Sequence, residues 1–296
     1  MKIKDITVVI RAAGERTLDL CHFLVSKQVE EQNIFIIEEK PFSKAVLKNF
    51  EIGIQNGHKF TLSIDADTLI YKDAVQLQLN NFKKLSENYF VYKGLVFDKF
   101  FNSYRSAGMH LYRTSLLEKA IDFIPKEGTS YRPESLTYKK MSKLGFHTYQ
   151  GTWAVGIHDD EQYYEDIYRK FFLHAHKHKI NDILSSWDEN WINNSDFKMA
   201  LKGLSDGLMY NKTVYVNKDF FSHHYLNAKD QFEIVEKTKY INQNTKWDQK
   251  CFFIHDKSEF FDSKLASKQK KITFFDKVKY KTGLQFENWG KQLKKY

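Results

Sequence analysis

Two aspartates stand two residues apart directly after an apolar run, because Asp65 and Asp67 follow the segment 60–64. Side chains alternate between the two faces of an extended strand, so both carboxylates project to one side and can share a cation. Mg²⁺ or Mn²⁺ commonly takes one or two carboxylates and fills its other positions with water and diphosphate oxygens. The pair therefore predicts a divalent-metal site that could neutralise a departing diphosphate. The alternative is a solvated turn that caps Lys72 and its neighbours.

A second group of reactive side chains comes where a long extended run meets a helical pattern: His158, Asp159, Asp160 and Glu161. The three acids are candidate catalytic residues, because a carboxylate at such a junction can act as general base toward an attacking hydroxyl. His158 is a candidate third metal ligand, since imidazole suits Mn²⁺ better than Mg²⁺. The structural alternative is that Asp159 caps the helix and the acids favour its dipole.

Other histidines are further candidates for the metal shell. His223 and His224 follow an aromatic pair and remain alternatives to His158 as the ligand that completes the site. The tract 174–178 holds three histidines with no acidic partner between them, which favours packed or solvated side chains over a metal site.

The elements that position these residues alternate along the first hundred residues. Apolar runs predict strands at 6–10, 34–37 and 60–64, and amphipathic spacing predicts helices at 18–25 and 42–55. A β-α-β-α-β order of this kind predicts an α/β fold with a mostly parallel sheet and helices on both faces. Further strands are expected at 88–97, 106–112 and 146–157, and further helices at 73–85, 115–123 and 160–177, with a mostly helical pattern up to about residue 225.

Ligands in such open sheets bind beyond the carboxyl ends of the strands. Arg11, Glu38 and Asp65 each follow a predicted strand. We therefore expect these three side chains to share one crevice.

The net charge of +9 is concentrated at the C-terminal end, where ten lysines and two acids follow residue 263. A nearly neutral body excludes a nucleic-acid-binding domain, and the tail predicts contact with an anionic membrane surface. Apolar residues recur in the tail at helical spacing, so docking onto the catalytic domain is the alternative. Without a spanning segment or signal peptide, the protein is expected in the cytoplasm, with peripheral attachment to the inner face of the membrane if the tail binds it.

Several short motifs form a series over roughly the first 115 residues. They are Thr7–Ile10, Glu38-Glu39, Phe42–Ala45, Asn56-Gly57, Ser63–Thr68 and Gly108–Tyr112. This series resembles the GT-A glycosyltransferases, in particular the bacterial family 2-like members. The first loop, which begins at Arg11, departs from the usual Pro-Thr-Tyr-Asn type.

The resemblance implies a GT-A (Rossmann-like) fold and a nucleoside-diphosphate sugar as donor, with uridine favoured as the base. It implies that Glu38 or Glu39 contacts the base or ribose. Lys44 would contact the nucleotide, and Asp65 the ribose or metal. Asp67 would hold the metal, Mn²⁺ or Mg²⁺. Arg11 is placed with the nucleotide-sugar-binding residues by the predicted crevice. The acceptor implied is a glycan or a lipid-linked molecule, as in surface polysaccharide synthesis.

Residues 1–225 are expected to form the catalytic domain, in which 1–115 bind the nucleotide-sugar and 116–225 face the acceptor. Residues 226–296 are expected to form a helical basic region. Two alternatives stay open. The loop 11–16 faintly resembles the Gly-rich loop of sugar-phosphate nucleotidyltransferases, although Glu15 stands where a second glycine is wanted. Aromatic richness also permits a non-catalytic carbohydrate-binding protein.

Overall fold

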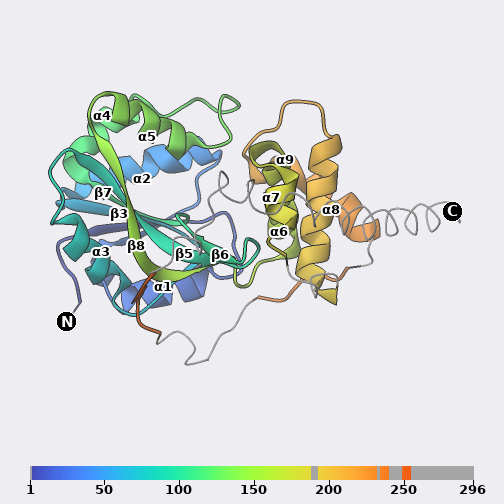
Figure 1. Ribbon diagram of the computed structural model, residues 1–296, viewed down its shortest axis with the longest axis horizontal. Helices are drawn as coiled ribbons and strands as arrows, with labels where there is room; N and C mark the ends of the chain where they lie inside the picture. The colour runs from blue at the N-terminus through green and yellow to red at the C-terminus, as the bar shows by residue number, and fades with distance from the viewer. Residues whose placement is uncertain (1, 188–192, 232–233, 240–248, 255–296) are drawn as a thin grey trace, which may run out of the picture.

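The computed structural model describes residues 2–187, 193–231, 234–239 and 249–254. A twisted sheet with helices on its faces makes up one part of the molecule, and a group of helices lies beside it (Figure 1). The predicted α/β fold class is confirmed, including the helical region that follows the sheet.

The N-terminal units form as the apolar runs predict. Strand β1 pairs in parallel with both β2 and β3, and the helices α1 and α2 make the two connections. Helix α2 ends at Gly57, whose φ of 70° is a left-handed conformation that glycine adopts at little cost. The five elements are β1 (Thr7–Arg11), α1 (Leu18–Ser26), β2 (Ile34–Ile37), α2 (Phe42–Asn56) and β3 (Phe60–Asp65).

The complete sheet has nine strands, and its main path runs β2-β1-β3-β7-β5-β8-β4. On this path β7 and β4 run against the other five strands, so the sheet is mixed but mostly parallel. Strand β6 pairs with β5, and β9 pairs with β8. The later strands are β4 (Thr68–Ile70), β5 (Tyr89–Asp98), β6 (Ser103–Arg105), β7 (Met109–Arg113), β8 (His147–His158) and β9 (Phe252–Phe253).

Three more helices pack around the sheet, namely α3 (Ala74–Phe82), α4 (Leu117–Ile121) and α5 (Pro133–Lys143). Helix α5 was not predicted, since no helix was expected between residues 123 and 146. Proline is well tolerated in the first turn of a helix, and here Pro133 begins α5.

The adjoining helices are α6 (Tyr164–Lys177), α7 (Ile180–Leu184), α8 (Ser195–Met209) and α9 (Lys218–Gln231). Helix α6 begins four residues later than the pattern predicts, so the residues after β8 form a loop. Asp159 has a φ of 60° and does not cap the helix, whose N-cap is Tyr163. The alternative prediction, that Asp159 caps this helix, is therefore wrong.

Helices α6 and α8 approach each other closely because glycines stand at their contact. A Cβ atom at Gly203 would lie 2.3 Å from the backbone oxygen of Tyr168, and one at Gly207 would lie 2.4 Å from that of Phe172. Backbone atoms cannot rotate away as a flexible side chain can. The two glycines therefore set the separation of the helices.

A Gly203→Ala variant is expected to be destabilised by about 1–3 kcal/mol, because the added methyl group forces the packed helices apart. Urea unfolding followed by circular dichroism measures the loss. Ser205→Ala on the same helix is the matched control and should leave the midpoint nearly unchanged. Equal stability of the Gly203 variant and the natural protein would contradict this account of the helix contact.

The predicted division at residue 225 falls within α9, and most of the segment 226–296 lies outside the described residues. The basic tail after residue 263 is entirely outside them, so its membrane contact stays a prediction. Within the described ranges, no helix combines the length and the apolar character needed to cross a bilayer.

Candidate active site

A crevice of about 250 Å³ opens where β1 and β3 end and is also lined by α6. Parallel pairing sets Arg11 opposite Asp65, and the pairing of β4 with β8 sets His158 opposite Thr68. The sheet register thus brings the two predicted clusters together. The predicted site residues that line the crevice are Arg11, Asp65, Asp67, His158 and Asp159.

Asp65, Asp67 and His158 each offer a ligand atom, and these atoms all lie within 4.8 Å of one another. The Oδ1 atom of Asp67 is 3.4 Å from Nε2 of His158. This oxygen is buried and makes no hydrogen bond within the described part of the chain. Neighbouring ligands of an octahedral ion with bonds of about 2.1 Å lie about 3 Å apart. The three side chains therefore suit a divalent cation.

The imidazole of His158 is oriented by carboxylates on its other side. Nδ1 lies 3.1 Å from Oδ2 of Asp98 and 2.7 Å from Oδ2 of Asp159. A proton on Nδ1 is donated to Oδ2 of Asp98 and leaves the lone pair of Nε2 directed toward Asp67, which is the usual arrangement behind a metal-bound histidine. Asp98 is fully buried, and its pKa is lowered by Arg105 and by the His158 hydrogen bond despite burial.

Asp67 stays ionised at neutral pH. Burial alone would raise the pKa of its carboxyl, but His158 and Lys170 lower it. An ionised carboxylate with a free oxygen is the form that a hard cation binds.

Asp65 is fixed by Arg11, whose side chain is only 4% exposed. Both Nε and Nη2 of Arg11 lie within 2.9 Å of Oδ1 of Asp65, and Nη1 is 2.7 Å from Oε1 of Glu134. Burial raises the pKa of Asp65, and Arg11 opposes that change. Since both contacts use one oxygen of Asp65, Oδ2 is the atom left for a ligand. Glu134, on the first turn of α5, was missed by the sequence analysis.

The three predicted bases lie in different surroundings. Asp159 lines the crevice and is 1% exposed, with Oδ2 paired to both His158 and Lys170. The backbone oxygen of Asp160 accepts a hydrogen bond from Lys99. Glu161 points into a second pocket, so the structure separates it from the candidate metal ligands Asp65, Asp67 and His158.

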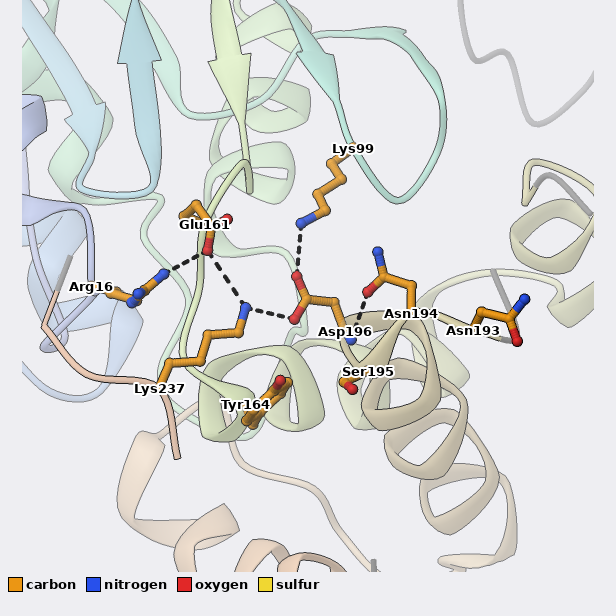
Figure 2. Close-up of a pocket in the computed structure, with 9 residues that line it drawn as sticks. All are labelled: Arg16, Lys99, Glu161, Tyr164, Asn193, Asn194, Ser195, Asp196 and Lys237. Carbon is orange, nitrogen blue, oxygen red and sulfur yellow. Dashed lines mark hydrogen bonds and ion pairs between the residues drawn. The ribbon is translucent and has the colours of Figure 1, made fainter. Parts of the chain in front are cut away.

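That second pocket, of about 620 Å³, is crossed by a chain of ion pairs (Figure 2). Arg16 contacts Glu161 at 2.5 Å, and Lys237 lies 3.6 Å from Glu161 and 2.5 Å from Asp196. Lys99 closes the chain 2.7 Å from Asp196. The side chains of Arg16 and Lys237 therefore both pair with Glu161, and the chain of ion pairs connects loops of the sheet to the helical region.

The remaining predicted residues lie outside the crevice lining. Glu38 and Glu39 follow the end of β2 and are both exposed, and of the two only Glu39 lines the crevice. Lys44 is exposed on α2, whereas Ala45 faces the crevice. Arg11 and Asp65 thus share the crevice as expected, and Glu38 does not.

His223 and His224 lie on α9 and line neither described pocket. The ring of His224 packs against Phe172 at 5.5 Å. Of the three histidines considered as a third ligand, His158 is the one that stands beside Asp67.

The crevice wall also contains acidic and basic groups that were not predicted. Burial raises the pKa of Glu15 to about 7, helped by Asp166 and Asp67 and opposed by Arg169. Helix α6 contributes several cations to the same wall. Polar residues recur on one face of α6, opposite Ile167 and its apolar neighbours, and this pattern in the sequence could have indicated the cations of α6.

No protein-family model matches the sequence, and no curated protein matches it. Among solved structures, the chain is similar to the mannosyltransferase PcManGT from Pyrobaculum calidifontis, in complex with GDP-Man and Mn²⁺ (10% identity, TM-score 0.41, 77% of this chain and 80% of that one). It is also similar to a glycosyltransferase involved in the glycosylation of the major capsid of PBCV-1 (13%, 0.39, 53% and 95%). A cytidylyltransferase from Leptospira borgpetersenii is a further neighbour (14%, 0.36, 72% and 100%). At these identities the likeness concerns the fold alone.

Proposed function

We propose that the protein is a metal-dependent glycosyltransferase that moves a sugar from a nucleoside-diphosphate sugar to a glycan or lipid-linked acceptor, in surface polysaccharide synthesis. The observation that carries the proposal is the buried, unpartnered Oδ1 of Asp67 beside Nε2 of His158 within the described residues. Mixed oxygen and nitrogen ligands suit Mn²⁺. A bound cation would supply positive charge to stabilise the departing diphosphate.

The residues around this pair have separate roles in the proposal. Asp67 and His158 hold the ion, and Oδ2 of Asp65 completes the protein ligands or contacts the ribose. Arg11 keeps Asp65 in place through two contacts to its other oxygen. Its guanidinium also lies 4.9 Å from the ring of Phe42, which lines the crevice as well.

Two carboxylates of the crevice are candidates for the base that accepts the proton of the acceptor hydroxyl. Asp159 was predicted for this role, but its Oδ2 is occupied by His158 and Lys170, so only Oδ1 could take a proton. Glu15 is the second candidate, because a pKa of about 7 suits a general base near neutral pH. A base role for either implies inversion at the anomeric carbon.

A panel of nucleotide-sugars incubated with the protein and Mn²⁺ tests the function. Release of nucleoside diphosphate that depends on Mn²⁺ and on one donor is the expected result. Pyrophosphate formed from a nucleoside triphosphate and a sugar phosphate would instead favour a nucleotidyltransferase. Binding of nucleotide-sugars without turnover, tested with a range of glycan acceptors, would favour a carbohydrate-binding protein.

A further inference from the structure

The crevice extends from the proposed metal ligands Asp65, Asp67 and His158, called here the metal-binding group, along one face of α6. Lys170, His174 and Lys177 stand four and three residues apart, so they share that face, and all three line the crevice. Lys170 is at the metal end, where it pairs with Asp159. Lys177 is at the other end, about 10 Å further along the helix at ~1.5 Å per residue.

Positive charge accumulates around Lys177. Shielding from water, together with the charges of Arg132 and Lys170, lowers the pKa of Lys177 to about 7. Arg132 approaches from the loop before α5 and donates to the backbone oxygen of Lys177 at 3.3 Å. Arg105 adds to the same field. Within the described ranges, no carboxylate forms an ion pair with the Lys177 ammonium group.

His174 provides an independent sign of a ligand. It is 6% exposed, and neither of its ring nitrogens has a hydrogen-bond partner among the described residues. A buried donor left unsatisfied costs about 1–3 kcal/mol, so such groups usually have a partner in the working protein. Its ring is held between Phe101, Phe171 and His178, which fixes its direction.

We propose that His174 and Lys177 form a subsite for a phosphate group that is separate from the proposed metal ligands Asp65, Asp67 and His158. An imidazole N–H and an ammonium group both donate hydrogen bonds to phosphate oxygens. The phosphate is either the part of the donor diphosphate remote from the metal or a phosphate carried by the acceptor. This subsite deepens the proposed function, although phosphate binding here does not depend on it.

Isothermal titration of the full chain tests the subsite with two probes, Mn²⁺ plus inorganic pyrophosphate and then inorganic phosphate. A Lys177→Gln variant is expected to lose about tenfold or more in affinity for one of them. A lower affinity of the variant for pyrophosphate assigns the subsite to the donor diphosphate. A lower affinity for phosphate, added to protein already saturated with Mn²⁺ and pyrophosphate, assigns the subsite to an acceptor phosphate.

Lys179→Gln, an exposed lysine two residues away, is the matched control and should bind both probes like the natural protein. His174→Phe preserves the aromatic packing and removes the donor, and it provides the test if the Lys177 variant does not fold. Unchanged affinity of the folded variants for both probes would overturn the subsite. Absence of Mn²⁺ binding with retained, Lys177-dependent phosphate binding would overturn the proposed function and leave the subsite standing.

Discussion

An Asp67→Asn variant is expected to lose at least about 100-fold in Mn²⁺-dependent turnover. The amide keeps the size of the side chain but removes the charge that holds the cation, and loss of even a supporting group at a metal site costs 10–100-fold. Steady-state release of nucleoside diphosphate at several Mn²⁺ concentrations measures the change. Part of the loss should be recovered at high Mn²⁺, because the other two ligands remain.

Asp73→Asn is the matched control for this substitution. Asp73 is exposed and has a φ of 65°, a conformation that asparagine tolerates well. Its variant should retain the natural rate and the natural Mn²⁺ dependence. An Asp67→Asn enzyme as active as the control would remove Asp67 from the metal site.

The free energy of unfolding of an Arg11→Met variant is expected to be lower by about 3–5 kcal/mol. The substitution removes the buried cation that pairs with both Asp65 and Glu134, and it leaves two half-buried carboxylates without that partner. Burial raises the pKa of Glu134, and Arg11 and His110 hold it low, so removing Arg11 raises that pKa and destabilises the ionised form. Urea unfolding at neutral pH measures the loss.

The double variant with Glu134→Gln separates the charge effect from lost packing. If the buried charge is the cause, Arg11→Met with Glu134→Gln should be more stable than the sum of the two single changes predicts. Additive losses would mean that the guanidinium acts mainly through its packing on Phe42. A stable Arg11→Met single variant would contradict the buried ion-pair account altogether.

The placement of Asp65 and Asp67 in the crevice could be predicted from the sequence because their signal is local. A buried strand, its parallel partner and an acidic pair at its end are all contained within the segment 7–67. There the spacing of apolar residues and the order of strands and helices determine the arrangement. His158 was predicted by type and position. Its contact with Asp67 depends on β4, a strand of three residues too short to leave a pattern.

The groups that support the site could not be predicted in the same way. Glu134 reaches Arg11 only because α5 packs over the sheet, and Asp98 is a single acid at the end of an apolar strand. The role of either depends on partners that are distant in the sequence. Glu161 is the opposite case. Its position between a strand and a helix predicted a catalytic base, but its ion pairs with Arg16 and Lys237 place it in another pocket.

Anomalous diffraction from crystals soaked in Mn²⁺ tests the metal centre most directly. The account predicts a manganese peak in coordination with Oδ1 of Asp67 and Nε2 of His158, near Oδ2 of Asp65. The peak should be absent from crystals of Asp67→Asn and present in those of Asp73→Asn. Manganese bound elsewhere in the crevice, or no manganese in crystals of the natural protein, would contradict the proposed metal centre.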